Sequence, residues 1–410
     1  MTKKIGILTG GGDCGGLNAA IEAVVKSADN EGWEVYGIRR GWEGLVFNNM
    51  FPLRVPDVDG IHSETGTVLQ TSRTNPYRFT GELDGQILEE ADVSERVIEK
   101  VRKAGLEAVI AAGGDDTLSV ISGNEYKNIL GLINDYGNDV TFIGIPKTMD
   151  GDLQTYSLGL DTAINRAKQK LEDFVPLLKA NGSIGIVEIF GRNVGRVTFK
   201  AGIAAGADAI FIPEIPVDPD YSVDFIADRY NQRAKSNNGV SYVLIAIAEG
   251  TKDPVTEQQV YLDNGEDSFG HGKLSGVANQ IKELLQGRLK DDPRITEHIR
   301  KLDIKIQTPT YDVRDGETLY SDSYTGQKLG AAAVKYLKEG AESGMAITNF
   351  NEHGQIESMP IRELIKPRPV HMEVLKMFER AGLYSFGRRP DQLLYTPAPV
   401  VSSPTGISTQ

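Results

Sequence analysis

Residues 4–20 read KIGILTGGGDCGGLNAA, and this stretch decides the fold. Its first part, Lys4–Thr9, is mostly apolar, which is typical of a strand covered on both faces. A glycine turn follows, and the apolar spacing from Leu17 onward predicts a helix with one buried face. Glycines allow close approach of the backbone and a helix N-terminus attracts anions, so this turn suits a phosphate group. A tight turn with packing glycines would explain the same residues.

Runs similar to the first strand recur along the chain and alternate with helical patterns such as that of residues 93–101. They lie at Glu34–Ile38, Glu107–Ala112, Val140–Ile145, Ser183–Ile189, Ala209–Ile212, Tyr242–Ala248 and Ile304–Gln307. Alternation of strands and helices predicts a doubly wound α/β fold with mainly parallel sheets. Because 410 residues exceed what one core usually serves, two lobes are expected. Ligands of such sheets bind beyond the carboxyl ends of the strands.

The composition excludes several classes of function. A formal charge of −13 argues against nucleic acid and anionic membranes as partners, since both favour a basic surface. The single cysteine, Cys14, excludes an intramolecular disulfide, and the five histidines form no cluster with metal-ligand spacing. With no signal-peptide pattern and no apolar run of membrane-spanning length, we expect a cytoplasmic protein.

Two acidic loops follow predicted strands. Gly113-Gly114-Asp115-Asp116 opens a helix, where one carboxylate can hold Mg²⁺ while the glycines admit phosphate oxygens. A helix N-cap explains one of these acids but not both. After the next strand, residues 146–152 read PKTMDGD, in which a carboxylate can accept a proton and Lys147 can neutralise a phosphate. A solvated charged loop is the alternative for this second stretch.

Basic residues that suit phosphate oxygens lie in three further loops. Arg73 stands in TSRTNP, Arg192 and Arg196 stand in FGRNVGR, and Arg314 closes YDVR. A single arginine is usually a surface residue, so each of these is weak evidence alone. Glu249, directly after a strand, can accept hydrogen bonds from sugar hydroxyls or cap a helix. Phosphoryl transfer needs positioning, Mg²⁺, cations and a base, and together the loops supply all of them.

In this order the motifs resemble the phosphofructokinase family over residues 4 to about 340, and among its members the pyrophosphate-dependent ones. The family pattern P-[K/G]-T-I-D-N-D matches residues 146–152 except at Met149 and Gly151. Gly15 also departs, since proline is usual there. The resemblance implies two Rossmann-like three-layer α/β/α lobes, and an enzyme that phosphorylates the 1-hydroxyl of fructose 6-phosphate reversibly in glycolysis, with Mg²⁺ as cofactor.

The resemblance also implies a role for each site residue. Asp150 would be the base, acting with Lys147 and Arg192, and Asp115 would hold the metal. Gly11, Gly12, Arg73, Asp116 and Lys147 would bind the donor, and Thr148, Asp150, Asp152, Phe190, Gly191, Arg192, Glu249, Lys305, Tyr311 and Arg314 would bind the sugar phosphate. ATP-dependent bacterial members usually carry glycine at the positions of Asp116 and Lys147. A carboxylate at Asp116 would repel the α-phosphate of ATP, which favours pyrophosphate as donor.

The acceptor is less well defined than the donor. Where the family carries arginines for the 6-phosphate, this chain has Ser183 and Lys305, and Phe190 replaces a usual methionine. Lysine replaces the arginine fork only as a point charge, so a ketose with a different group at carbon 6 stays open as the acceptor. Arg196 is a candidate to compensate for the missing arginines. An ATP-dependent kinase and a catalytically silent regulatory subunit also stay open. The glycine spacing of the first loop differs from the dinucleotide-binding fingerprint, which argues against a dinucleotide-dependent oxidoreductase.

The resemblance divides the chain into three parts. Residues 1–160 with about 314–365 would form the phosphate-donor lobe, and residues 161–313 the sugar-phosphate lobe. Residues 366–410 would be a C-terminal extension ending in a mobile tail, because residues 397–410 are rich in proline and serine. The resemblance further implies a homodimer or homotetramer.

Overall fold

The computed structural model describes residues 2–123, 128–136, 140–266, 272–314, 316–380 and 384–389. It divides into two compact units. Unit 1 comprises residues 1–170, 262–273 and 309–368, and unit 2 comprises the remainder. The predicted tail, residues 397–410, lies outside the described residues.

Unit 1 is built on a sheet of seven strands in the order β15-β14-β7-β6-β1-β2-β3. The strands are β1 (Lys4–Thr9), β2 (Glu34–Ile38), β3 (Met50–Pro52), β6 (Ala108–Gly113), β7 (Thr141–Pro146), β14 (Met345–Phe350) and β15 (Ile356–Pro360). The five inner strands pair in parallel, and β3 and β15 close the two edges antiparallel. Because β7, β6 and β1 are neighbours, the loops that follow them meet at one end of the sheet.

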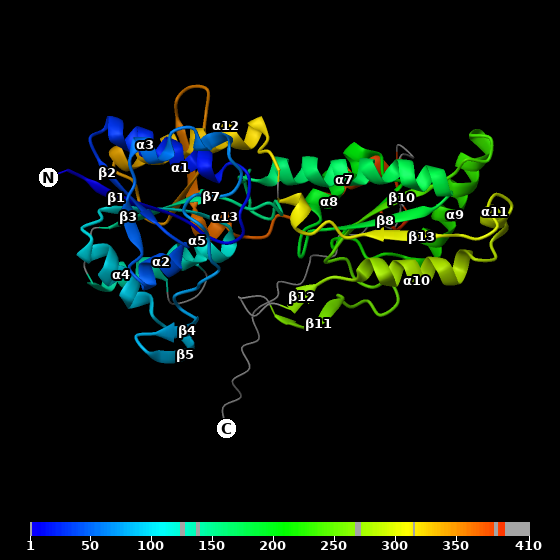
Figure 1. The fold of residues 1–410 in the computed structure, drawn as a ribbon, viewed down its shortest axis with the longest axis horizontal. Helices are drawn as coiled ribbons and strands as arrows, with labels where there is room; N and C mark the ends of the chain where they lie inside the picture. The colour runs from blue at the N-terminus through cyan, green and yellow to red at the C-terminus, as the bar shows by residue number, and fades with distance from the viewer. Residues whose placement is uncertain are drawn as a thin grey trace. The chain divides into compact units, whose positions relative to one another are not determined.

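Helices cover both faces of this sheet (Figure 1). The helical elements of unit 1 are α1 (Leu17–Asn30), α2 (Trp42–Val46), α3 (Val55–Val58), η1 (Ile61–Ser63), α4 (Ser94–Lys103), α5 (Asp115–Ser122), α6 (Ile129–Tyr136), η2 (Tyr311–Val313), α12 (Tyr320–Lys338) and α13 (Ile361–Leu364). Ile7 of β1 packs with Ile21 of α1 in one core, whereas Leu8 packs with Val97 of α4 in another. Alternate residues of one strand thus enter two cores, which makes three layers.

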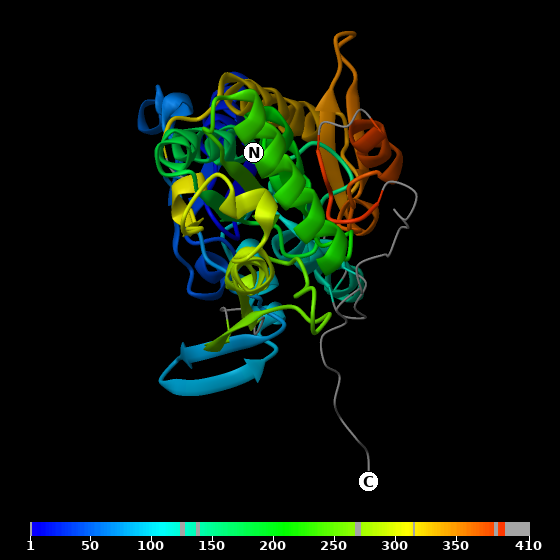
Figure 2. The same cartoon turned by 90° about the vertical axis from the view of Figure 1, so that its right-hand side faces the viewer.

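A two-stranded hairpin, β4 (Phe79–Leu83) and β5 (Gln86–Ala91), extends away from the sheet of unit 1 and is light blue in Figure 2. A second short pair, β11 (Tyr261–Glu266) and β12 (Gly272–Leu274), precedes α10 in the chain. Helix α7 (Leu160–Asn181) contains the boundary between the units, which falls after Lys170.

Unit 2 has a parallel sheet of four strands in the order β13-β8-β10-β9. Its elements are β8 (Ile184–Ile189), α8 (Arg196–Ala205), β9 (Ala209–Phe211), α9 (Pro219–Ser236), β10 (Val243–Ala248), α10 (Val277–Leu289), α11 (Pro293–Thr296), β13 (Ile304–Gln307) and α14 (Met372–Arg380). Residues from β8, α9 and α10, among them Ile186, Ile226 and Ile281, form one core. Each of the eight predicted strands is present and differs by at most one residue at either end. The predicted α/β fold with mainly parallel sheets is confirmed.

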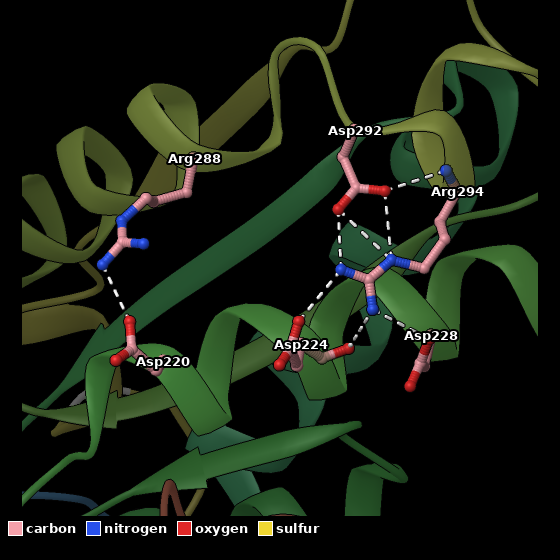
Figure 3. Close-up of polar contacts among 6 residues, drawn as sticks. All are labelled: Asp220, Asp224, Asp228, Arg288, Asp292 and Arg294. Carbon is pink, nitrogen blue, oxygen red and sulfur yellow. Dashed lines mark hydrogen bonds and ion pairs between the residues drawn. The ribbon is translucent and has the colours of Figure 1, made fainter.

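An ion-pair cluster fastens α11 to α9 in unit 2 (Figure 3). Arg294 contacts Asp224 and Asp228 of α9, both at 3.0 Å, and Asp292, the N-cap of its own helix, at 2.7 Å. Asp292 is mostly buried, whereas both α9 carboxylates are well exposed. The cluster therefore orients a short helix that has little core of its own.

Candidate active site

The glycine loop after β1 is joined to the loop that carries Arg73. The backbone N–H of Gly11 donates to the Ser72 carbonyl at 3.0 Å, and the Thr71 hydroxyl donates to the Gly11 carbonyl at 2.5 Å. Arg73 follows directly in the chain. The two predicted donor-binding segments, far apart in sequence, are therefore held side by side in unit 1.

Lys147 and Arg314 converge on Gly12. The Lys147 ammonium donates to the Gly12 carbonyl at 2.5 Å, and its side chain is almost fully buried. Burial lowers the pKa of Lys147, and the neighbouring Arg314 lowers it further. A Cβ on Gly12 would overlap Nη1 of Arg314, so a larger residue there would displace the guanidinium. Arg314, predicted to bind the sugar phosphate, thus lies against the predicted donor loop.

Three carboxylates gather where β6 and β7 end. Asp115 is the first residue of α5, and Asp150 and Asp152 lie in the loop after β7. Burial raises the pKa of Asp152 to about 8, and the charges of Asp115 and Asp150 add to this effect. The residue keeps some exposed surface, but its Oδ1 atom is buried and has no hydrogen-bond partner among the described residues. A cation beside Asp152 would oppose both effects and favour its charged form.

The chemistry of this donor set fits Mg²⁺. Within the described ranges no group of three or more His, Cys, Asp or Glu side chains is arranged to hold a metal ion. Mg²⁺ does not need such a cage, because it is usually bound by one or two carboxylates, several waters and the phosphates of its substrate. The buried, unbonded Oδ1 of Asp152 near Asp115 satisfies this lesser requirement.

The loop that carries Asp150 is closed at its base. Lys147 forms a β-bridge with Leu158, and the Ser157 hydroxyl donates to the Thr148 carbonyl at 2.8 Å. The Thr148 hydroxyl in turn accepts the backbone N–H of Asp150 at 3.2 Å. The loop after β7 is thus a fixed support for its two acids rather than an open turn.

Two of the remaining predicted site residues also lie in unit 1: Asp116 is the second residue of α5, and Tyr311 is 76% exposed. The others lie in unit 2. Phe190, Gly191 and Arg192 follow β8, and Glu249 follows the neighbouring β10. The N–H of Glu249 donates to the Ile189 carbonyl at 2.8 Å, and that of Gly250 to the Gly191 carbonyl at 3.1 Å. These bonds bring the two loops together. Lys305 lies in β13 and forms an ion pair with Asp303.

Sequence reasoning missed three buried acids that accept hydrogen bonds from loops and from helix starts. Glu214 accepts hydrogen bonds from the N–H of Gly195, at the start of α8, and from that of Val370 at 3.0 Å. Glu188, the last residue but one of β8, accepts the N–H of Ala278 at 2.9 Å and so caps the start of α10. Asp322 of α12 bonds the segment after the Asp150 loop. The position of Glu188 inside an otherwise apolar strand was a sequence signal for a buried acid, whereas Glu214 and Asp322 stand in no such pattern.

Comparison with known proteins finds one family whose model matches most of this chain. The family model described as Phosphofructokinase matches residues 4–337. Pyrophosphate–fructose 6-phosphate 1-phosphotransferase of Dictyoglomus thermophilum is 36% identical over 358 residues, which cover 86% of this chain and 91% of the relative. ATP-dependent 6-phosphofructokinase 2 of Clostridium perfringens is 31% identical over 354 residues, with 85% and 89% covered.

The fold also has close counterparts among solved structures. Phosphofructokinase of Pichia pastoris in the T-state superposes with a TM-score of 0.67 over 93% of this chain. The identity is 23%, so this likeness shows the fold alone, and the chain spans 37% of the length of that larger protein. In the part of this chain that the structure describes, none of the helices is both long and apolar enough for a membrane span.

Proposed function

Because this chain belongs to the phosphofructokinase family, we propose that it transfers a phosphoryl group from pyrophosphate to the 1-hydroxyl of fructose 6-phosphate, reversibly and with Mg²⁺. The observation that carries the donor choice is the pair Asp115-Asp116 at the start of α5, beside a loop in which Lys147 is buried against Gly12. The relative from Dictyoglomus thermophilum supports this choice, as its name includes pyrophosphate. We further propose that the enzyme acts in the cytoplasm as a homodimer or homotetramer.

Asp150 takes the proton of the attacking 1-hydroxyl in this proposal, and Asp152 supports it. Lys147 and Arg192 neutralise the transferring phosphoryl group, and Arg73 holds the donor beside Gly11 and Gly12. Asp115 would hold Mg²⁺, which supplies positive charge to the phosphate oxygens when bound. The Thr148 hydroxyl accepts the backbone N–H of Asp150, so the loop fixes the main chain that carries the proposed base.

Asp150→Asn tests the base directly. We expect kcat to fall by at least ~10²-fold, the usual lower range for loss of a general base. Asp291→Asn, at an exposed position of unit 2, is the matched control and should leave the rate unchanged. A rate for Asp150→Asn close to that of the control would remove Asp150 from this role.

Asp116 discriminates between donors by repulsion in this proposal. A compact pyrophosphate has no α-phosphate with an attached nucleoside, so the Asp116 carboxylate penalises ATP alone. Replacing Asp116 and Lys147 together by glycine should therefore lower the rate with pyrophosphate and raise the rate with ATP. If both rates fall and their ratio does not change, the donor assignment is wrong.

A second candidate is an ATP-dependent phosphofructokinase, which the relative from Clostridium perfringens favours. The acceptor also has an alternative, a related ketose with a different group at carbon 6. Ser183 is fully buried and the Lys305 ammonium is paired with Asp303, so neither offers the grip of an arginine fork. Measuring pyrophosphate and ATP against several 6-substituted ketoses tests donor and acceptor together. Activity with ATP alone would reject pyrophosphate.

A further inference from the structure

Asp322 is a fully buried carboxylate in the first turn of α12, and it accepts four hydrogen bonds from one short segment. Its Oδ1 accepts the Tyr156 hydroxyl at 2.6 Å and the N–H of Gly159 at 2.9 Å. Its Oδ2 accepts the N–H of Thr162 at 2.8 Å and the Thr162 hydroxyl at 2.6 Å. Each carboxylate oxygen of Asp322 therefore accepts two hydrogen bonds.

The segment that Asp322 binds is continuous with the loop of Asp150. The N–H of Leu158 donates to the Pro146 carbonyl at 3.1 Å, and Leu158 forms the β-bridge with Lys147. Residue 157 bonds the Thr148 carbonyl in the same place. A movement of residues 156–162 would therefore be passed to the base of the loop after β7.

The same turn of α12 also touches the start of α1. A Cβ on Gly16, the N-cap of α1, would lie 2.6 Å from the backbone oxygen of Asp322. One turn and two turns further along α12, Gly326 and Gly330 leave no room for a Cβ against the backbone of α1. Residue 322 thus stands where the glycine loop, the Asp150 loop and the beginning of α7 meet.

We propose that Asp322 is a positioning residue, which holds the Asp150 loop in register with the glycine loop for phosphoryl transfer. The inference rests on the proposed function of those two loops but not on the choice of donor. The role requires a carboxylate, because the N–H groups of Gly159 and Thr162 are fixed and point at different oxygens. An amide would turn its own NH₂ group toward one of them and lose that bond. Burial raises the pKa of Asp322, while the four donors favour its charged form.

The test compares Asp322→Asn with Glu22→Gln. Glu22 is the matched control, because it is also a buried acid of unit 1 and accepts hydrogen bonds from Lys26 and His62, which lie outside the site. Two readouts are needed: kcat with each substrate varied, and hydrogen–deuterium exchange of peptides covering residues 147–162. We expect Asp322→Asn to lower kcat about 10- to 100-fold, the cost of roughly 1 Å of misplacement, with faster exchange in those peptides. The predicted sugar-phosphate contacts in unit 2 are untouched, whereas Thr148, Asp150 and Asp152 lie in the displaced loop. The KM for fructose 6-phosphate should therefore rise by a smaller factor than kcat falls.

A merely structural role predicts another pattern. Asp322→Asn would then melt earlier, as Glu22→Gln does, but keep its kcat, and this result would overturn the proposal. If Asp322→Asn does not fold, Thr162→Val and Thr162→Ser replace it, since only serine keeps the hydroxyl that bonds Asp322. Loss of kcat in the valine variant with recovery in the serine variant supports the proposal, and equal rates in the two oppose it. If the wild-type protein uses ATP and not pyrophosphate, the donor assignment is wrong. Asp322→Asn and Glu22→Gln can then be compared with ATP as donor, so the role of Asp322 is still tested.

Discussion

Gly16→Ala tests the close packing of α12 on the glycine loop, and its effect follows from two separate costs. Gly16 has a φ of +88°, a left-handed conformation that costs an alanine about 1–2 kcal/mol. The new Cβ would also lie 2.6 Å from the backbone oxygen of Asp322, so α12 must retreat by about 0.8 Å to reach the 3.4 Å of ordinary contact. Overpacking of this kind adds about 1–3 kcal/mol.

Gly32→Ala, near the other end of α1, is the matched control. Gly32 has a φ of +71°, but a Cβ added there would meet nothing within 4 Å, so alanine adds strain without a clash. In urea denaturation, Gly16→Ala should therefore lose about 1–3 kcal/mol more than Gly32→Ala. Its kcat should fall by about tenfold or more, because the glycine loop is displaced, while the control keeps its rate. Free energies of unfolding of the two variants that agree within about 0.5 kcal/mol would refute the close packing of α12 on the glycine loop.

Three further variants extend the test to other charges. Lys147→Met removes a phosphate contact and should lower kcat about 10²- to 10³-fold. It also removes a buried charge, so the melting temperature should not fall; a wild-type kcat would contradict the role of Lys147. Glu379→Gln should flatten the pH dependence of the melting temperature. Burial raises the pKa of Glu379 from 4.5 to about 7, so its contribution is present below about pH 4.5 and lost as the pH rises to about 7; identical pH profiles would oppose it. Arg294→Ala should lower the melting temperature at pH 7, and less so near pH 3. Arg294 lowers the pKa of Asp292, so that the stabilisation by this ion pair is lost as the pH falls. If the difference in melting temperature between wild type and Arg294→Ala is the same at pH 7 and pH 3, this reasoning is wrong.

The strands and the loops that follow them could be predicted because their signals are local. An apolar run such as Val140–Ile145 ends where glycine, proline or aspartate begins, and no distant residue is needed to read that pattern. The sequence alone did not order the strands in the sheet. Only the order β7-β6-β1 explains why Asp115, Asp150 and Gly12 belong to one end of one sheet.

Contacts over long stretches of chain escaped prediction. Arg314 follows a motif that resembles a sugar-phosphate contact, yet its guanidinium lies against Gly12, and no local pattern encodes that contact. Asp322 lies between Tyr320 and Tyr324, which are 85% and 64% exposed, so the stretch is typical of a solvated helix face. Its burial depends on glycines in two helices that approach each other only in the folded chain. A buried polar network of this kind is set by tertiary packing and leaves little trace in hydrophobic periodicity.

Lys147 and Asp152 connect the local electrostatics to the proposed donor. Burial lowers the pKa of the lysine and raises that of the aspartate, so the same physical cause acts against both charges. A phosphate group beside Lys147 and a cation beside Asp152 would each restore the charged form. Neither ion alone serves both residues, because each would repel the group of its own sign. A complex of Mg²⁺ with the phosphate chain of a donor carries both signs of charge within a few ångströms. The two residues therefore suit a Mg²⁺-bound phosphoryl donor, and the choice of pyrophosphate over ATP rests on Asp116.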